Sequence, residues 1–260
     1  MKSMQRIWLV SVASALLVCA GPRQAAAWTM SQFVSNGEPV EQYACAPDSK
    51  QPSPAVILLH GAEVHGASYH NLERICTDLA AQGYYAEMIE YYSQGEEVVP
   101  GEFGQIRKSF RRWVWKIHDG LDALGKNPAV DPKRIGVMGY SLGGLMALAI
   151  GARHSDQIAA VVDYYGGLPP SVKEQAATMP PTLIIHGGKD RIVLAQLSRE
   201  LDKILTDAGR PHQLKLYPDA DHAFNFDDSK TYDTSDTQAA WTATLDFLAQ
   251  YLKGNPPASQ

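Results

Sequence analysis

Short apolar runs alternate with amphipathic stretches along most of this chain, and this alternation constrains the fold more than any other feature. Residues 55–59 are apolar throughout, which is typical of a strand covered on both faces, and comparable runs occur at 134–140, 158–164 and 182–186. Stretches with apolar residues at helical spacing separate these runs. The pattern predicts an α/β fold with a mainly parallel, twisted sheet and helices on both faces.

The remaining elements follow from the same two periodicities. Further strands are predicted at residues 40–45, 84–90 and 213–217. Helices are predicted at residues 71–82, 105–124, 142–153, 194–208 and 236–252. The acidic, glycine-containing segment 93–104 is expected to be a loop. We expect one domain over residues 28–253, followed by a frayed C-terminal tail at 254–260.

Residues 1–27 have the features of a signal peptide. Two basic residues precede an apolar run at 7–20, and Ala25-Ala26-Ala27 matches an A-x-A cleavage site. The apolar run is shorter than the roughly 20 residues that span a bilayer. We expect cleavage after Ala27, a periplasmic or secreted protein, and no stable membrane anchor. Lipid attachment at Cys19 is the alternative, but Val18 stands where a small residue is expected.

The charge balance excludes two classes of partner. Cleavage removes three basic residues and no acidic one, so the formal net charge falls from −5 to 20 − 28 = −8. An acidic chain without a basic block is poorly suited to nucleic acid or to anionic membrane surfaces. We expect a small-molecule partner, and the oligomeric state stays open.

The mature chain keeps two cysteines, Cys45 and Cys76. An exported protein can oxidise such a pair, but the sequence does not show that their Cα atoms come within bridging distance. A disulfide and two buried free thiols therefore both remain open. There is no C-x-x-C pair and no zinc-like His/Cys spacing, so we expect no metal.

The most specific motif is Gly139-Tyr140-Ser141-Leu142-Gly143, a G-x-S-x-G pentapeptide between the predicted strand 134–140 and the predicted helix 142–153. At a strand–turn–helix junction this motif forms a nucleophile elbow, which presents a serine hydroxyl above the sheet. Ser141 is the candidate nucleophile. A serine hydroxyl is a weak nucleophile at neutral pH and needs a base within hydrogen-bond reach.

His222 is the candidate base and Asp190 the residue that orients it. Each follows a predicted strand at its carboxyl end, and the order serine, acid, histidine is the order found in α/β-hydrolases. Asp163 and Asp221 are alternative acids, although Asp163 falls inside an apolar run and Asp221 is adjacent to His222. His186 is an alternative base that we interpret as a packing residue.

The negative charge that develops on a substrate carbonyl oxygen needs backbone donors. Leu142 offers its N–H at the start of a predicted helix, where the helix dipole also favours an anion. The second donor is expected in the loop after residue 59, with Ala62 preferred over Glu63 and Val64.

Three segments resemble the dienelactone hydrolase family. They are Gly139-Tyr140-Ser141-Leu142-Gly143-Gly144, His186-Gly187-Gly188-Lys189-Asp190 and Tyr217-Pro218-Asp219-Ala220-Asp221-His222-Ala223-Phe224. The resemblance covers most of the chain after about residue 40. It implies a single α/β-hydrolase domain that uses no cofactor and hydrolyses small esters or lactones.

The chain departs from the family pattern at three positions. Well-known members use a cysteine nucleophile, whereas this chain has Ser141. They place a glutamate near the oxyanion loop, for which Glu63 is the candidate counterpart and a substrate-pocket candidate. They also place an arginine four residues after the histidine, where this chain has Phe226. Arg107, Arg111 and Arg112 are the nearby cations, and they can equally form a solvated helix face.

Aromatic residues gather at the predicted strand ends, and we expect some of them to line a substrate pocket. The candidates are Tyr91, Tyr92, Tyr164, Tyr165, Phe224 and Phe226, with core packing as the alternative for at least half of them. The sequence as a whole predicts an exported serine hydrolase. The alternatives are a peptidase or acyltransferase on the same three side chains, or a catalytically silent binding protein.

Overall fold

The computed structural model describes residues 28–62, 67–93, 95, 96, 98, 103–226 and 232–254. The predicted signal peptide and residues 255–260 of the predicted tail lie outside these ranges. Eight strands form one sheet in the order β1-β2-β4-β3-β5-β6-β7-β8. The strands are β1 Thr29–Ser35, β2 Glu38–Cys45, β3 Ser53–Leu59, β4 Tyr85–Ile89, β5 Val130–Tyr140, β6 Ala160–Tyr164, β7 Thr182–Gly187 and β8 His212–Tyr217.

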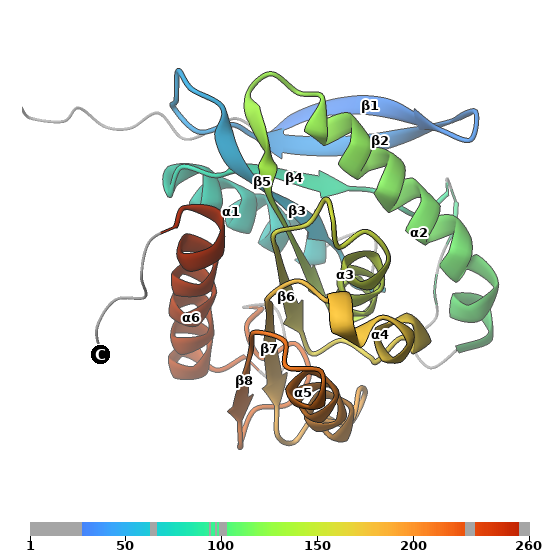
Figure 1. Cartoon of the computed structure of the whole chain (residues 1–260), viewed down its shortest axis with the longest axis vertical. Helices are drawn as coiled ribbons and strands as arrows, with labels where there is room; N and C mark the ends of the chain where they lie inside the picture. The colour runs from blue at the N-terminus through green and yellow to red at the C-terminus, as the bar shows by residue number, and fades with distance from the viewer. Residues whose placement is uncertain are drawn as a thin grey trace, which may run out of the picture.

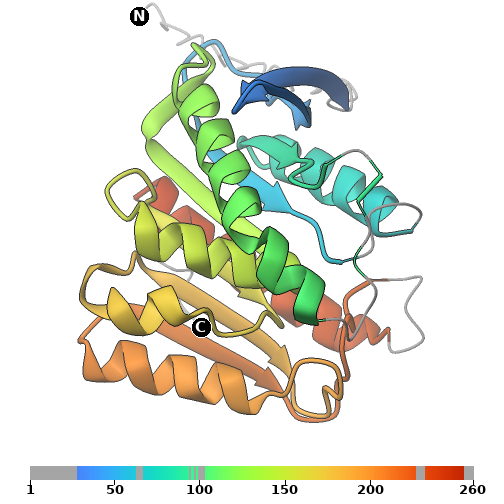
Figure 2. The same ribbon diagram turned by 90° about the vertical axis from the view of Figure 1, so that its right-hand side faces the viewer.

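The sheet is mainly parallel, as the sequence predicts. β1 pairs with β2 and β2 with β4 in antiparallel register, and every other neighbouring pair is parallel. The parallel strands point their carboxyl ends to one edge of the sheet (Figure 2). In open α/β sheets this edge is where ligands bind.

Helices cover both faces of the sheet (Figure 1). Helices α1 (Ala67–Ala81) and α6 (Thr234–Leu252) lie on one face. On the other face lie α2 (Phe103–Gly125), α3 (Leu142–Arg153), α4 (Pro170–Glu174) and α5 (Gln196–Asp207). A short 3₁₀ helix, Ala176–Thr178, follows α4. In the part of the chain that the structure describes, no helix combines the length and apolarity needed to cross a membrane.

The hydrophobic core forms two layers, one on each side of the sheet. All seven residues of β3 are buried, because helices cover it from both sides and strands flank it at both edges. Alternate β3 residues enter opposite layers: Ile57 and Leu59 pack toward α2 and α3, whereas Val56 and Leu58 pack toward α1 and α6.

Three elements were not predicted: β1, α4 and the short 3₁₀ helix. Six of the seven residues of β1 retain exposed surface, so this edge strand has no apolar run to mark it. Helix α4 has only five residues and begins at Pro170, which is too short to show a helical periodicity.

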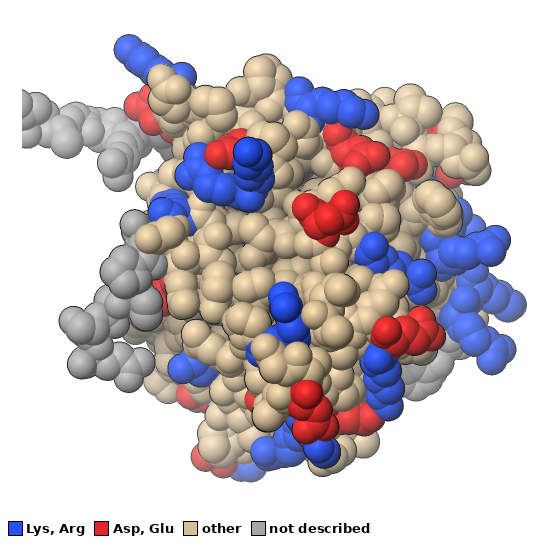
Figure 3. Space-filling model, in the orientation of Figure 1, with Lys and Arg blue, Asp and Glu red and all other residues tan. Residues whose placement is uncertain are grey.

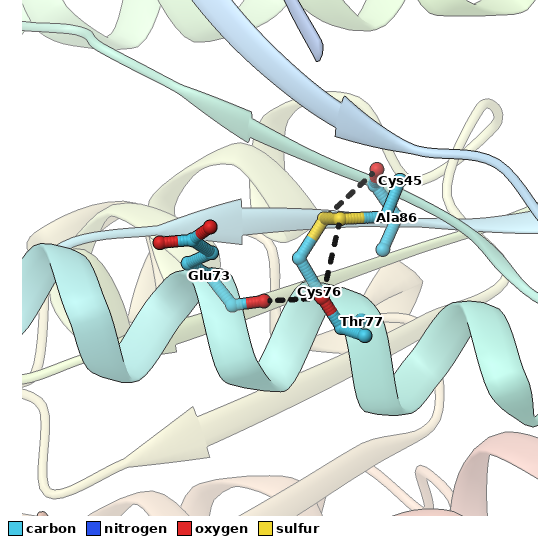
Figure 4. The surroundings of a disulfide bond; sticks show 5 residues. All are labelled: Cys45, Glu73, Cys76, Thr77 and Ala86. Atoms are coloured by element: carbon cyan, nitrogen blue, oxygen red, sulfur yellow. Dashed lines mark hydrogen bonds between the residues drawn. A yellow bond between two sulfur atoms is a disulfide. The ribbon is translucent and has the colours of Figure 1, made fainter. Parts of the chain in front are cut away.

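A disulfide joins Cys45, the last residue of β2, to Cys76 in the middle of α1 (Figure 4). The two Cα atoms lie 5.7 Å apart, and both cysteines are fully buried. This geometry decides the question that the sequence left open, because it falls within the normal range for a bridge. The disulfide fastens the antiparallel edge of the sheet to the helix that covers it.

Candidate active site

Ser141 occupies a strained turn between β5, which ends at Tyr140, and α3, which begins at Leu142. Its backbone has φ 55° and ψ −114°, a conformation that non-glycine residues rarely adopt. The N–H of Ser141 donates to the carbonyl of Tyr164 at 2.9 Å, which ties the turn to the end of β6. Residues held in such conformations cluster at active sites, and the surrounding structure must hold them there.

Gly143 allows the first turn of α3 to pack directly on the end of β3. A Cβ atom at this position would collide with the carbonyl oxygens of Leu59 and His60, both of which belong to rigid backbone. The sequence motif therefore requires glycine here for close packing, and this packing places the loop after β3 beside Ser141. A Cβ atom built on Gly61 would lie only 3.6 Å from the Cβ of Ser141.

Ser141, His222 and Asp190 form a continuous hydrogen-bonded chain. The Nε2 of His222 lies 2.9 Å from the Oγ of Ser141, and its Nδ1 lies 2.7 Å from the Oδ2 of Asp190. Ser141 follows β5, Asp190 follows β7 and His222 follows β8, so the ends of three parallel strands of one sheet contribute the three side chains. With Nδ1–H donating to the carboxylate, Nε2 is left free to accept the serine proton.

The carboxylate of Asp190 is held from several sides. Its Oδ1 accepts the N–H groups of Ile192 (2.9 Å) and Val193 (2.8 Å), and the Nε2 of His186 lies 3.2 Å from its Oδ2. Burial opposes ionisation of Asp190, but the hydrogen bonds from His186 and His222 outweigh it and hold the pKa of this carboxyl well below its ordinary value. Asp190 is therefore ionised at neutral pH and fixed in orientation.

The two alternative acids point elsewhere. Asp163 is buried within β6, where its Oδ1 accepts the N–H of Gly166 at 3.0 Å, and desolvation raises its pKa to about 7. The Oδ1 of Asp221 accepts the backbone N–H of His222, and its Oδ2 pairs with Arg191 at 3.2 Å. The imidazole ring of His222 is therefore oriented by Asp190 rather than by Asp163 or Asp221.

His186 is fully buried at the end of β7, in agreement with its interpretation as a packing residue. Its Nδ1 lies 2.6 Å from the hydroxyl of Ser198, and its Nε2 lies 2.8 Å from the carbonyl of Val193. Burial lowers the pKa of His186, but its hydrogen bonds to Asp190 and to the Val193 carbonyl outweigh burial and raise the pKa above the ordinary value. His186 thus helps to hold the carboxylate of Asp190 in place.

The candidate oxyanion donors belong to two segments, the start of α3 and the loop after β3. Leu142 is the first residue of α3, where N–H groups have no acceptor within the helix. Ala62 lies in the loop after β3, one residue beyond Gly61. Glu63 and Val64 lie outside the described residues.

The six aromatic residues that we predicted to line a pocket are buried. Tyr91 and Phe224 have no exposed surface, Tyr164 and Tyr165 are 1% exposed, Tyr92 is 4% exposed and Phe226 is 8% exposed. The hydroxyl of Tyr165 donates to Asn225 at 2.7 Å, and its ring packs edge-on against His222 at 4.8 Å. The packing alternative therefore accounts for these residues better than an open aromatic pocket.

Phe226 stands where family members place an arginine. Phe226 packs on the ring of Tyr140 at 5.0 Å, and Arg107, Arg111 and Arg112 are exposed on α2. Arg112 pairs with Glu96. Figure 3 shows basic side chains gathered along the edge of the molecule that α2 forms, so these arginines belong to a solvated helix face.

Two residues beside the site, His60 and Glu90, were not predicted. They follow the ends of β3 and β4 and lie beside the predicted aromatic residue Tyr92: His60 Nε2 lies 3.1 Å from Glu90 Oε1, and the rings of His60 and Tyr92 meet edge to face at 4.9 Å. The sequence does show a polar residue directly after each of these strands. It does not show which backbone groups such a residue contacts in the folded protein.

Comparisons with known proteins agree with this architecture. The model of the dienelactone hydrolase family matches residues 40–252. A Yersinia pestis protein named "Putative carboxymethylenebutenolidase" is 29% identical over 239 residues, which cover 84% of this chain and 86% of that protein.

Two solved structures share the fold. A dienelactone hydrolase-like promiscuous phosphotriesterase from metagenomic libraries has a TM-score of 0.76 at 20% identity, covering 88% of this chain and 99% of its own. The acylaminoacyl peptidase of Pyrococcus horikoshii has a TM-score of 0.72 at 17% identity, covering 91% of this chain and 43% of its own.

Proposed function

The chain belongs to the dienelactone hydrolase family, and on that premise we propose that it is a serine hydrolase cleaving small carboxylic esters or lactones through an acyl-enzyme. The observation that carries the proposal is the hydrogen-bonded chain from Ser141 Oγ through the imidazole of His222 to Asp190. This arrangement can remove a proton from a serine hydroxyl as the oxygen attacks a carbonyl carbon.

Acylation proceeds in two steps. His222 Nε2 takes the proton as Ser141 Oγ bonds to the carbonyl carbon, and the electron pair of the carbonyl moves to its oxygen. The N–H groups of Leu142 and Ala62 stabilise this oxyanion. Asp190 keeps Nδ1 protonated and balances the positive charge on the imidazolium. The tetrahedral intermediate then collapses, the bond to the leaving oxygen breaks, and His222 gives its proton to that oxygen.

Deacylation repeats the same chemistry with water. His222 takes a proton from water as the water oxygen bonds to the acyl carbon, and the second tetrahedral intermediate expels Ser141 Oγ. His222 returns the proton to the serine. A lactone follows the same course, except that the leaving hydroxyl stays attached to the released acid.

The relatives support a small substrate. A name such as carboxymethylenebutenolidase denotes hydrolysis of a lactone, and the family model extends over nearly the whole described domain. Because Phe226 replaces the arginine expected from the family, we propose neutral esters or lactones as better substrates than anionic ones.

We also propose that the protein is exported and that residues 1–27 are removed. The disulfide between Cys45 and Cys76 supports this proposal independently of the leader sequence, because such bonds persist in oxidising compartments and are rare in the cytosol.

A panel of p-nitrophenyl esters and small lactones tests the proposed activity. Wild type is expected to hydrolyse at least one short-chain ester, and Ser141→Ala is expected to lose nearly all of that activity. Ser171→Ala is the matched control, because Ser171 is also buried and its hydroxyl has no bonded partner. Equal turnover by wild type and Ser141→Ala would contradict the proposal.

The same panel separates the alternatives. Turnover of peptide amides without turnover of esters would indicate a peptidase, and transfer of the acyl group to an added alcohol in preference to water would indicate an acyltransferase. Folded wild type that acts on none of these substrates would indicate a binding protein.

A further inference from the structure

Three consecutive peptide carbonyls in the loop after β3 are each bonded by a buried side chain. The hydroxyl of Tyr91 donates to the carbonyl of His60 at 2.7 Å, and the Nδ1 of His60 lies 2.7 Å from the carbonyl of Gly61. The hydroxyl of Tyr92 donates to the carbonyl of Ala62 at 3.4 Å. His60 and Tyr91 have no exposed surface, and Tyr92 is 4% exposed. This irregular loop is therefore tied at successive peptides.

The hydrogen bonds to these carbonyls also determine where the N–H groups of the same peptides point. In a trans peptide, the carbonyl of one residue and the N–H of the next point in opposite directions, and no cis peptide occurs among the described residues. Because His60 binds the carbonyl of Gly61, the N–H of Ala62 points away from His60. Among the described residues, no acceptor is bonded to this N–H. The same peptide lies beside Ser141, as the 3.6 Å separation from a Cβ on Gly61 shows.

The contacts of His60 fix the position of its ring. A carbonyl can only accept, so the Nδ1 facing Gly61 carries a proton. Nε2 faces Glu90 Oε1 at 3.1 Å, and that oxygen also accepts the N–H of Tyr92 at 3.2 Å. The Tyr91 ring stacks on the imidazole at 4.1 Å and 5°, which fixes its plane.

We propose that His60, Tyr91 and Tyr92 are positioning residues of the oxyanion hole, which hold the loop carbonyls back so that the N–H of Ala62 stays aimed at the reacting carbonyl oxygen. This inference rests on the proposed hydrolase function. Donors that are already oriented need no reorganisation when charge develops. A peptide released from these bonds can rotate and turn a carbonyl dipole toward the oxyanion, which would repel it.

Removing one hydroxyl tests the inference with little change in packing. Tyr91→Phe keeps the ring and loses the 2.7 Å bond, so kcat/KM for p-nitrophenyl acetate is expected to fall about 10-fold, with the loss in kcat rather than in KM. Tyr92→Phe is expected to cause a smaller loss, because its bond is longer. Thr182→Val is the matched control: it removes an equally buried hydroxyl that also donates to a main-chain carbonyl, that of Pro180 at 2.9 Å, at the amino end of β7. Its activity is expected to stay within about two-fold of wild type.

A trifluoromethyl ketone separates oxyanion stabilisation from a general structural effect. Its adduct with Ser141 carries an oxyanion, so its Ki is expected to rise in Tyr91→Phe by the same factor by which kcat/KM falls. Unchanged turnover in Tyr91→Phe, a loss of turnover without a change in Ki, or equal losses in Thr182→Val would each overturn the inference.

The amide resonance of Ala62 distinguishes failure of the inference from failure of the proposed function. Wild type that hydrolyses no ester would contradict the proposed function alone. In that case, a ¹H–¹⁵N spectrum in which Tyr91→Phe shifts the Ala62 resonance and Thr182→Val does not would still support the positioning role. An Ala62 resonance that both variants leave in place would overturn it.

Discussion

Opening the disulfide between Cys45 and Cys76 is expected to destabilise the protein strongly. The bridge closes a loop with a sequence separation of 31 residues. In the loop-entropy relation, a loop of that length removes about 12 cal/mol/K of entropy from the unfolded chain, or about 3.7 kcal/mol at 25 °C. For a domain of this size, that corresponds to a decrease in Tm of about 7–15 °C.

Urea unfolding of oxidised and reduced wild type, followed by tryptophan fluorescence and circular dichroism, measures this difference directly. The reduced protein is expected to unfold at lower urea concentration, with a larger m value, because its unfolded chain is no longer cross-linked. Thiol titration in denaturant confirms that two sulfurs are joined in one sample and free in the other. A Cys45→Ala/Cys76→Ala variant that resembles the reduced protein serves as a control for the reductant. Oxidised and reduced forms that agree within about 1 kcal/mol would refute the reasoning, since the calculated effect is several times larger.

Three further predictions concern buried groups. Burial raises the pKa of Glu87 in β4 to about 8, so Glu87 ionises in the unfolded chain at lower pH than in the folded protein. The free energy of unfolding therefore falls between about pH 4.5 and 8, by up to about 5 kcal/mol. Glu87→Gln is expected to remove this part of the pH dependence of urea unfolding, and identical profiles for the two proteins would contradict it. Asp190→Asn is expected to lower kcat by a factor of about 10⁴ while the protein stays folded, because the amide no longer holds Nδ1 of His222 protonated. Ester turnover measures this effect, with circular dichroism as the folding control. A loss under about 10-fold would contradict the role of Asp190 in orienting His222. Gly143→Ala is expected to abolish activity, because the new Cβ would collide with backbone carbonyls. A Cβ at Gly104 on α2 would contact no other residue, so Gly104→Ala is expected to retain wild-type turnover. Equal activity of the two variants would show that the turn at Ser141 tolerates a side chain at position 143.

The parallel centre of the fold could be predicted because its strands are buried on both faces. β3, β5, β6 and β7 carry apolar runs, and such runs can be recognised without any knowledge of tertiary contacts. β1 could not be predicted, because an edge strand with a solvated face needs no apolar run. The pairing of β1 with β2 can be seen only in the folded structure.

The hydrogen-bonded residues Ser141, Asp190 and His222 could be found for a related reason. Parallel strands bring their carboxyl ends to one edge, so polar residues that follow separate strands become neighbours in space. The contacts of His60 and Tyr91 could not be found, because they are bonds from side chains to main-chain carbonyls and depend on the path of a loop. The pairing of Cys45 with Cys76 depends in the same way on how α1 packs on β2.

The aromatic residues show where residue type alone misleads. Tyr165 and Phe224 occur at strand ends near the site, and this placement suggests a substrate pocket, yet both side chains are buried. The position of a residue at a strand end predicts that it lies near the site. Whether its side chain lines a pocket or is buried behind one depends on how the loops after β6 and β8 pack on each other.

The central claim is that the hydroxyl of Ser141 is a nucleophile activated by His222. Reaction of the folded protein with a fluorophosphonate, followed by peptide mapping in a mass spectrometer, tests it directly. The account predicts one adduct, located on Ser141, with no labelling of Ser141→Ala and much slower labelling of His222→Ala. Folded wild type that stays unlabelled, or an adduct on any other residue, would contradict it.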